Sequence, residues 1–381
     1  MASVSKVHTK DGRTKYRARY RDLDRYQREQ WFDRKIEADA FCAAVVADQT
    51  RGVFVDPRRS AVTLSAWSET WWETKSHLKP STTASYESLL RLLILPRLGN
   101  RSLGSIRSED VGSWLSELKS TDLSASRVRQ AYRVLNNLFS LAVDYERLVR
   151  NPASTDGIRR AVPRATTQEM RFLTLEQVLR LSEVIEDEFS AMILTLAVGG
   201  LRWGEVAALR SRRVDVRNHR IHVVEGATEV RGQLIFGSPK SGRDRWVDIP
   251  RYVTKGIADR MDSVGADPDA LIFTTQRGAP LRISNFRNRV WRRALRDSEI
   301  SEDTRIHDLR HTAASLMIED GAHMFFLQQQ LGHASIVTTQ RYAHLYPSQG
   351  IALRDRMDDR FSKLSGAGVG LGQSKLVSIA G

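Results

Sequence analysis

Apolar and polar residues alternate with two different periods along the first 56 residues of the chain. The period-2 pattern of β-strands appears three times, in Val4–Thr9, Arg13–Arg21 and Tyr26–Phe32. Asp11 and Gly12 form a hairpin turn signal between the first two stretches. The pattern then changes to the helical period, with apolar residues three or four positions apart from about Asp33 to Gln49. Residues 1–56 therefore predict a separate module of three strands and one helix.

The second predicted strand carries cations at alternate positions. They are Lys15, Arg17, Arg19 and Arg21. Because successive side chains of a strand point to opposite faces, these cations share one face and Tyr16, Ala18 and Tyr20 share the other. A basic ribbon of this kind can lie in a DNA groove. The solvated face of a small sheet has the same pattern, so the strand alone leaves both interpretations open.

Helical periodicity dominates residues 62–152, after a short linker that includes residues 57–61. Four helices are predicted: Thr63–His77, Ser81–Leu95 with a stop at Pro96, Ser108–Leu118 with Ser108 as its cap, and Ser124–Val149. Asn151-Pro152 ends the last of them. Three arginines of this helix, Arg127, Arg129 and Arg133, lie off its apolar face, and we expect them to be available for DNA.

Residues 153–170 show little apolar periodicity and are basic, with Arg159 and Arg160 among them, which predicts a flexible connector between two DNA-binding domains. An ordinary polar loop has the same composition. A third domain is predicted for residues 171–362, opening on the capping box Thr174-Leu175-Glu176-Gln177. Helices follow to about Arg210 and return from about Ser284. Between them we expect strands near Arg220–Glu225, Gln233–Phe236 and Arg245–Ile249. Residues 363–381, rich in glycine from Gly366, predict a flexible tail.

Composition narrows the class of protein. The 381 residues are enough for two or three domains, and their net charge of +14 and pI near 10.1 favour a polyanionic partner such as nucleic acid. Arginine outnumbers lysine by 48 to 11; a GC-rich genome explains that ratio but not the net charge. The single Cys42 excludes a disulfide framework within one chain. No apolar run approaches 18 residues and no signal peptide is visible, so we expect a soluble, intracellular protein.

Candidate chemistry gathers in the third predicted domain. Two guanidinium groups can clamp the non-bridging oxygens of a phosphate, and Arg202 and Arg310 are the candidates. Arg202 follows Gly199-Gly200-Leu201, whose glycines would let a phosphate approach the backbone, and Glu205 lies one turn later to hold the arginine. His307 precedes Arg310 by one helical turn. His307 and His311 have the spacing of a metal pair, but no HExxH motif or cysteine partner supports one.

Three further residues complete the set. Lys240 lies in Ser238-Pro239-Lys240-Ser241-Gly242 between two predicted strands, where a hairpin tip can deliver an ammonium group to a minor groove. His333 follows Leu331-Gly332, and Tyr342 comes nine residues later. A tyrosine is a nucleophile that needs no metal, provided that its proton is removed or its anion is stabilised. Tyr346 lies nearby, but its Leu-Tyr-Pro context favours a structural role.

This order of residues resembles the active site of the tyrosine recombinases, the phage integrase family. Leu331-Gly332-His333 and Thr339-Gln340-Arg341-Tyr342 resemble the family's ending closely, and all the strong motifs lie within residues 199–346. The resemblance implies a multidomain, mainly α fold with small β-sheets. Its parts are an arm-type DNA-binding domain with a three-stranded sheet and a helix, a helical SAM-like core-binding domain, and an α-rich catalytic domain with a small antiparallel sheet.

The resemblance also implies a mechanism. Tyr342 attacks the scissile phosphate and becomes linked to the 3′ phosphate, while Lys240 protonates the leaving 5′ oxygen. His307 assists proton transfer, and His333 hydrogen-bonds the phosphate. Bond energy is conserved, so no cofactor, ATP or metal is expected. The implied partners are double-stranded DNA with core and arm attachment sites, three further copies of the chain in a tetramer, a host DNA-bending factor and an excisionase. The expected location is the cytoplasm of a host bacterium, on DNA.

Other functions fit part of this pattern. The same chemistry serves chromosome-dimer resolution, transposition and inversion, but the module at residues 1–56 favours a phage or mobile-element integrase. A type IB topoisomerase uses a similar site, and the N-terminal module and the histidine in the ending argue against it. A non-catalytic DNA-binding regulator would need neither Tyr342 nor Lys240.

Overall fold

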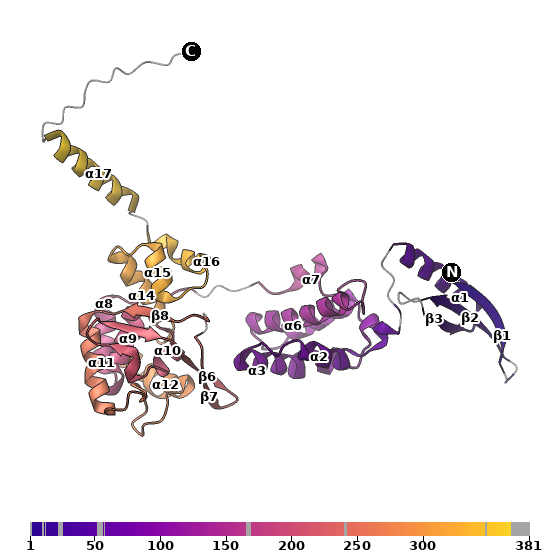
Figure 1. Ribbon diagram of the computed structural model, residues 1–381, viewed down its shortest axis with the longest axis horizontal. Helices are drawn as coiled ribbons and strands as arrows, with labels where there is room; N and C mark the ends of the chain where they lie inside the picture. Colours follow the sequence, from indigo (N-terminus) through magenta and orange to yellow (C-terminus); the bar gives the residue numbers. More distant parts are fainter. Residues whose placement is uncertain are drawn as a thin grey trace, which may run out of the picture. The chain divides into compact units, whose positions relative to one another are not determined.

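The computed structural model describes residues 2–9, 11, 13–21, 26–51, 56, 58–164, 169–239, 242–346 and 349–366, and the side chains of all these except 349–353 and 364–366. The chain divides into two compact units, Met1–Gln168 and Glu169–Gly381. Figure 1 shows the helices and strands of both.

The N-terminal end of unit 1 is a three-stranded antiparallel sheet covered by one helix. The strands are β1 (Ser3–His8), β2 (Thr14–Arg21) and β3 (Gln27–Phe32), in the order β1-β2-β3, and the helix is α1 (Lys35–Thr50). Ala18 and Tyr20 on β2 are buried and share apolar clusters with Ala38 and Val45 on α1. The predicted module of three strands and a helix is therefore confirmed.

The rest of unit 1 is a helical bundle around a tryptophan-rich core. Its elements are η1 (Arg59–Ala61), α2 (Leu64–Glu73), α3 (Pro80–Leu89), the π-helical turn η2 (Leu90–Ile94), α4 (Leu95–Leu98), η3 (Leu103–Ser105), α5 (Ser108–Lys119), α6 (Ala125–Asp144) and α7 (Asp156–Ala161). Trp67, Trp71 and Trp114 are almost fully buried. The indole nitrogens of Trp67 and Trp114 donate to the carbonyls of Leu138 and Leu93, so each links two helices as well as filling the core.

Four predicted helix ends in the bundle are wrong, one of them the end of α2, which lies at Glu73 rather than His77. The helix expected to stop at Pro96 continues to Leu98, because Pro96 lies in the first turn of α4, where a missing N–H costs no hydrogen bond. Ser108 does not cap α5; Asp110 accepts from the backbone N–H of Arg107 instead, at 2.8 Å. Helix α6 ends at Asp144 rather than Val149, and Glu146 then takes a positive φ.

The connector expected at residues 153–170 is folded over its first part, so flexibility is the wrong prediction there. Residues 156–161 form α7, and Ala153 and Ile158 are buried in the core of the bundle. Lys119 at the end of α5 donates to the carbonyl of Ala161 at 3.3 Å. The bundle thus extends past residue 152, and residues 165–168 lie outside the described residues.

Unit 2 is rich in helices. They are α8 (Leu175–Val184), α9 (Asp187–Gly199), α10 (Trp203–Ala207), η4 (Ser211–Arg213), α11 (Arg251–Val264), α12 (Ile283–Phe286), the π-helical turn η5 (Arg287–Trp291), α13 (Arg292–Asp297), α14 (Asp308–Glu319), α15 (Met324–Leu331), α16 (Ile336–Thr339), η6 (Gln340–Leu345) and α17 (Gln349–Gly366). The predicted capping box is present, since Thr174 and Gln177 exchange side-chain to backbone hydrogen bonds at the start of α8.

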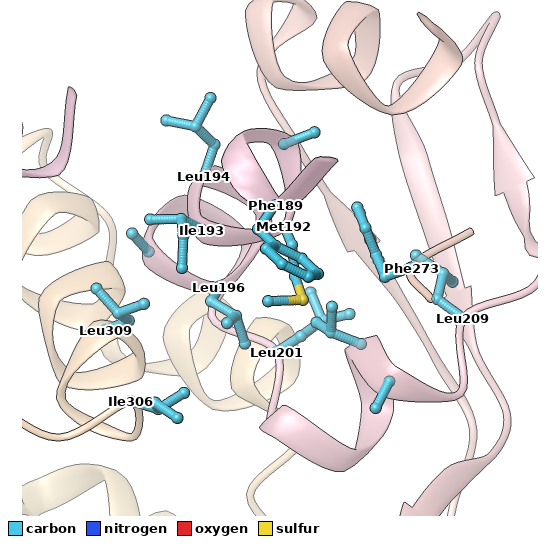
Figure 2. Close-up of a cluster of buried hydrophobic side chains, with 14 of the residues drawn as sticks. Phe189, Met192, Ile193, Leu194, Leu196, Leu201, Leu209, Phe273, Ile306 and Leu309 are labelled. Carbon is cyan, nitrogen blue, oxygen red and sulfur yellow. The ribbon is translucent and has the colours of Figure 1, made fainter. Parts of the chain in front are cut away.

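Helix α9 lies at the centre of this unit and packs against α8, α11 and α14. It is apolar on nearly all sides, as expected for a helix surrounded by others. Figure 2 shows Met192, Ile193 and Leu196 of α9 among Leu201, Phe273, Ile306 and Leu309. The core therefore connects the end of α9 and the start of α14, which both carry candidate site residues.

The strands of unit 2 form two small antiparallel sheets. One contains β4 (Val214–Asp215), β5 (Arg220–Val223) and β8 (Arg245–Asp248), and the other contains β6 (Gly226–Val230) and β7 (Gln233–Gly237). The sequence predicted β5, β7 and β8 but not β4 or β6. Since β7 pairs with β6 and β8 pairs with β5, the segment between β7 and β8 joins two sheets. The predicted hairpin of β7 and β8, with Lys240 at its tip, is therefore wrong, because these two strands do not pair with each other.

Candidate active site

Residues far apart in the sequence meet at one turn of unit 2. This turn is Leu331–Gly332, at the end of α15. Arg310, in the first turn of α14, donates to the carbonyl of Leu331 at 2.6 Å, and Arg202, just before α10, donates to the carbonyl of Gly332 at 3.3 Å. His333 follows the turn directly. The structure thus brings together the two predicted phosphate-clamping arginines and the predicted phosphate-binding histidine.

Two glycines permit this arrangement. Gly200, at the end of α9, has a φ of 69°, and a Cβ there would lie 2.6 Å from Leu331 Cδ2. Gly332 has a φ of 65°, and a Cβ there would lie 2.7 Å from Arg245 Cδ. We expected Gly199 and Gly200 to admit a phosphate. Their surroundings indicate a different reason for glycine, because protein side chains already occupy the adjacent space.

Glu205 links Arg202 to a second arginine, Arg245 on β8. Arg202 bonds the carboxylate of Glu205 through its backbone N–H and its guanidinium, both at 2.8 Å. Arg245 bonds the same carboxylate with two parallel hydrogen bonds of 3.0 and 2.8 Å. Burial alone would raise the pKa of Glu205, but the bonds from Arg245 and the charge of Arg202 lower it to about 2. The expected contact between Glu205 and Arg202 is present, and it belongs to a buried charge network.

Arg310 is held from two sides and is only 3% exposed. One terminal nitrogen donates to the carbonyl of Gly200 at 2.5 Å, and the other donates to Leu331. Burial and the nearby charge of Arg202 lower the pKa of Arg310 to about 9, so the guanidinium stays charged at neutral pH. Each terminal nitrogen keeps a second hydrogen for another acceptor. The network fixes the plane of this cation and leaves donors for an anion.

His307 lies at the N-cap of α14 and is exposed. The next residue, Asp308, is fully buried and accepts from the backbone and the guanidinium of Arg305, which fixes the start of the helix. Partial burial of its ring and the charge of Arg310 lower the pKa of His307 to about 4. His307 and Arg310 are thus both positioned by the first turn of α14, one exposed and the other buried.

His333 is held on one side by Thr339 of α16, with 2.9 Å between Nδ1 and the hydroxyl oxygen. Burial and the charges of Arg310 and Arg202 lower the pKa of His333 to about 3. The ring is therefore neutral at physiological pH. Because Nδ1 already has a partner, Nε2 is the atom left for a ligand.

Tyr342 lies on η6 and is 1% exposed. Its hydroxyl lies 2.7 Å from Nδ1 of His311, which follows Arg310 on α14. Burial raises the pKa of Tyr342, while Arg310 and Arg341 oppose that rise. Tyr346 has a different environment, since its hydroxyl donates to the carbonyl of Ala322 at 3.0 Å. That bond agrees with the structural role expected of Tyr346.

Lys240 lies outside the described residues, as does Ser241. The described flanks are the end of β7 and the start of β8. Arg245, the first residue of β8, belongs to the charge network with Glu205. The connection that carries Lys240 therefore ends at this network.

The predicted DNA-contacting residues all lie in unit 1. On β2, Arg17 and Arg19 both contact Glu29 of β3, Lys15 contacts Asp33, and Arg21 is exposed. On α6, Arg127 donates to the hydroxyl of Ser88 on α3, so it ties two helices together rather than standing free. Of the other four, Arg129 is partly buried, whereas Arg133, Arg159 and Arg160 are exposed.

Sequence reasoning missed two members of the site. Arg245 was placed only on a predicted strand, although it shares a strand face with the buried Val247, where an arginine requires an acidic partner. His311 was weighed only as half of a metal pair. Its spacing to Ala314 and Ile318 places it on the buried face of α14, and that signal was available.

Neither a metal-binding cluster nor a membrane-spanning helix is seen in the part of the chain that the structure describes. There, no three His, Cys, Asp or Glu side chains are grouped closely enough to hold a metal ion. Within the same residues, no helix is long and apolar enough to cross a membrane.

Comparison with known sequences finds family matches in both units. Residues 171–349 match the Phage integrase family, and residues 63–119 match the Phage integrase, N-terminal SAM-like domain. The integrase of Mycobacterium phage D29 is 26% identical over 358 residues, covering 91% of this chain and 92% of that protein. Tyrosine recombinase XerC of Pelobacter propionicus is 28% identical over 301 residues, covering 72% of this chain and 87% of that protein.

Solved structures share the fold. The Tn1549 transposon integrase in complex with a circular intermediate DNA has a TM-score of 0.67 at 21% identity, covering 77% of this chain and 99% of that chain. A lambda integrase tetramer bound to a Holliday junction has a TM-score of 0.56 at 19% identity, covering 86% and 92%. The predicted multidomain, helix-rich fold is therefore confirmed. The chain belongs to the phage integrase family of tyrosine recombinases. It is a site-specific recombinase, an enzyme that breaks and rejoins DNA strands.

Proposed function

We propose that this recombinase integrates a phage or other mobile element into a bacterial chromosome, using Tyr342 as its nucleophile. The observation that carries the assignment of the site is the convergence of Arg202 and Arg310 on the Leu331–Gly332 turn, beside His333 and the Tyr342–His311 pair. These are the groups that a metal-independent transfer of a phosphodiester needs: two fixed cations, a neutral hydrogen-bond donor and a phenol.

The proposed reaction proceeds by two transfers of the same phosphoryl group. The Tyr342 oxygen attacks the scissile phosphate, the bond to the 5′ oxygen breaks, and a 3′-phosphotyrosine and a 5′ hydroxyl result. Lys240 supplies the proton to the leaving oxygen. Arg202, Arg310 and Nε2 of His333 bind the non-bridging oxygens. The 5′ hydroxyl of a partner strand then attacks the phosphotyrosine and releases Tyr342. Because each step exchanges one phosphate ester for another, the reaction is proposed to need neither ATP nor a metal.

Tyr342 is buried in the chain without DNA, so a bound phosphate does not reach its hydroxyl in this conformation. We propose that DNA binding rearranges η6 so that the Tyr342 hydroxyl becomes accessible to a phosphate while it keeps its contact with His311. This 3₁₀ helix is short and follows the four-residue helix α16. Short helices of this kind change conformation at lower cost than the long, fully packed α9.

The proposed DNA partners are core and arm attachment sites. The solved relatives include an integrase on DNA and a tetramer on a Holliday junction, which supports a tetramer of this chain on DNA. The basic face of β2 is proposed to bind arm sites. A host DNA-bending factor and an excisionase are proposed as further partners, and the host cytoplasm as the location.

Integration is favoured over chromosome-dimer resolution by the extent of similarity. The phage D29 integrase aligns with 91% of this chain, whereas the XerC protein aligns with 72%. The N-terminal module would have no evident task in a resolution enzyme that binds a single core site. Transposition and inversion use the same chemistry, and the sequence of the target DNA distinguishes them from integration.

A covalent trap tests the proposal. The protein is incubated in EDTA with fragmented DNA from its element and host and quenched with detergent, and the attached DNA is sequenced. Adducts with wild type but not with Tyr342→Phe are expected, and the recovered DNA gives the target site. Adducts with both proteins would move the nucleophile to another residue, with Tyr346 next to be tested. Firm DNA binding without any adduct would favour a regulator over an enzyme.

A further inference from the structure

Attack by Tyr342 requires a destination for its phenolic proton, because a neutral phenol is a weak nucleophile. We propose that His311 is a catalytic residue that accepts this proton through Nδ1 as the Tyr342 oxygen attacks the phosphate. This inference rests on the proposed function, since it takes Tyr342 as the nucleophile. It transfers a role that the sequence assigned to His307.

The geometry is that of a direct proton transfer. Nδ1 of His311 lies 2.7 Å from the Tyr342 oxygen, and both residues are at least 95% buried. We assign the hydroxyl as the donor and Nδ1 as the acceptor, which places the hydrogen of the neutral ring on Nε2. A general base has to lie within hydrogen-bond reach of the proton that it removes, and His311 meets that condition before any DNA is bound.

The other candidate bases of the site are engaged elsewhere. Nδ1 of His333 contacts Thr339, and the Asp308 carboxylate is held by Arg305. The Glu205 carboxylate accepts from two arginines. His307 is exposed, and its ring lies edge-on to that of His311 with 5.1 Å between centroids. That position makes His307 a route from His311 to solvent rather than the first acceptor.

The charges around the pair keep it neutral at rest. Burial and the neighbouring His307 lower the pKa of His311 to about 4, with Arg341 and Arg305 adding to the effect and Asp308 opposing it. Burial raises the pKa of Tyr342. At neutral pH the ring is therefore free to accept, and the phenol holds its proton until attack begins. As the oxygen–phosphorus bond forms, the phenolic oxygen loses its affinity for the proton, and Nδ1 becomes the stronger base.

The step balances without a further reagent. The oxygen–hydrogen bond of Tyr342 breaks while its oxygen–phosphorus bond forms, and the proton moves to Nδ1. The 5′ oxygen leaves with the proton that Lys240 is proposed to supply. In the rejoining step, the phosphotyrosine bond breaks and His311 returns the proton to the Tyr342 oxygen. One histidine thus acts as base in cleavage and as acid in rejoining.

The test measures the rate of covalent adduct formation in a single turnover on the DNA duplex recovered by the trap. Four variants of the full chain are compared with wild type: His311→Ala, His311→Asn, His344→Ala and Tyr342→Phe. His344 is the matched control, because it is an exposed histidine on η6. His311→Ala is expected to slow the reaction by about 10²–10⁴-fold, the usual contribution of a general base. His344→Ala is expected to match wild type. Thermal melting and DNA binding verify that each variant is folded.

Chemical rescue separates proton transfer from a structural role. Free imidazole is expected to restore the rate of His311→Ala by about tenfold or more, since it can enter the space left by the ring and accept the proton. Replacing Tyr342 by 3,5-difluorotyrosine, whose phenol is more acidic, is expected to narrow the difference in rate between the chain with His311 and the His311→Ala variant. His311→Asn keeps a hydrogen-bonding group near Nδ1 but cannot be protonated, so it is expected to stay slow.

Each other outcome is informative. A His311→Ala chain that reacts as fast as wild type, or faster, would overturn the proposal and make the contact a lock on a buried nucleophile. A wild-type rate for His311→Asn, or a loss that neither imidazole nor the fluorinated phenol changes, would also overturn it in favour of a positioning role. If His311→Ala does not fold, His311→Asn replaces it in the test. A slow His311→Asn chain whose rate rises with 3,5-difluorotyrosine at position 342 would support proton transfer, and a wild-type rate would overturn it. Adducts formed by Tyr342→Phe would instead refute the proposed function itself.

Discussion

Two regions of this chain are rich in arginine, and they use it in opposite ways. On β2, the cations lie on an open face: Arg17 and Arg19 share Glu29, and their side chains are 24% and 40% exposed. In the active site, Arg310 is 3% exposed and donates to two backbone carbonyls. The first arrangement presents charge to solvent, and the second fixes the plane of a single cation.

The difference in burial sets what each arginine can do. Exposed ion pairs contribute about 0–1 kcal/mol to stability and are screened by salt, so a phosphate can displace Glu29 easily. A buried, hydrogen-bonded cation acts in a medium of low dielectric, where its interaction with a developing negative charge is several times stronger. The β2 face is therefore suited to binding DNA, and the buried site to stabilising a transition state.

Of the changes predicted here, removal of the Arg310 guanidinium should have the largest effect, and it should act on the rate of strand cleavage. Arg310→Ala is expected to slow strand cleavage by about 10³–10⁵-fold, the range for arginines that stabilise phosphoryl transfer. Arg310→Lys keeps the charge but loses the planar fork between Gly200 and Leu331, so it is expected to remain slow. Adduct formation in a single turnover measures both. The control is Arg296→Ala, which removes an exposed arginine of the same unit. Cleavage by Arg310→Ala at the wild-type rate would mean that burial of this cation has no catalytic purpose.

The next effect is on stability and concerns Glu205. Glu205→Gln leaves two partly buried arginines without their buried carboxylate, which is expected to cost about 3–5 kcal/mol. The pKa of Glu205 in the folded chain, about 2, lies below its ordinary value of 4.5. Its contribution is therefore complete above about pH 4.5 and is lost as the pH falls toward 2.

Thermal melting of wild type and Glu205→Gln at several pH values measures this contribution. The melting temperatures should differ most at pH 7 and converge as the pH is lowered toward 3. Glu225→Gln is a suitable control, because that carboxylate also pairs with an arginine, Arg210, but is 22% exposed. A gap that stays constant with pH would contradict the assigned pKa of Glu205.

Much of the fold and of the site was predictable because both depend on local order. The period-2 and helical patterns located the N-terminal sheet, the helix α1 and the capping box at Thr174. The order of arginine, histidine and tyrosine residues pointed to one site, and the structure places Arg202, Arg310 and His333 at one turn. Residue types at fixed separations suffice for such predictions, since the chemistry restricts which side chains can serve.

The remainder depends on contacts between distant segments. Arg245 is 40 positions from Glu205, and His311 is 31 positions from Tyr342, so no local pattern pairs them. Strand pairing failed for the same reason: periodicity identifies β7 and β8 but does not say that each pairs with a different neighbour. The continuation of the helix past Pro96 and the cap formed by Asp110 each depend on one or two hydrogen bonds. Helix propensity does not locate a helix end to within one or two residues, so it does not predict such details.

The smallest predicted effect belongs to the open face of β2. Arg19→Gln is expected to weaken binding to end fragments of the element a few-fold and to reduce the slope of log affinity against log salt by about 1, the value for one phosphate contact. Glu29→Gln releases both Arg17 and Arg19 and is expected to act in the opposite direction. Fluorescence anisotropy at several salt concentrations measures both, and each variant should keep its stability within about 0.5 kcal/mol.

The control is Lys35→Gln, which removes an equal, exposed charge from α1 on the other side of the sheet. If Arg19→Gln and Lys35→Gln weaken binding equally, the β2 face contributes only net charge, and the ordered ribbon has no role of its own. If Arg19→Gln alone lowers both affinity and slope, while cleavage of a core duplex is unchanged, the two arginine-rich regions have separate tasks.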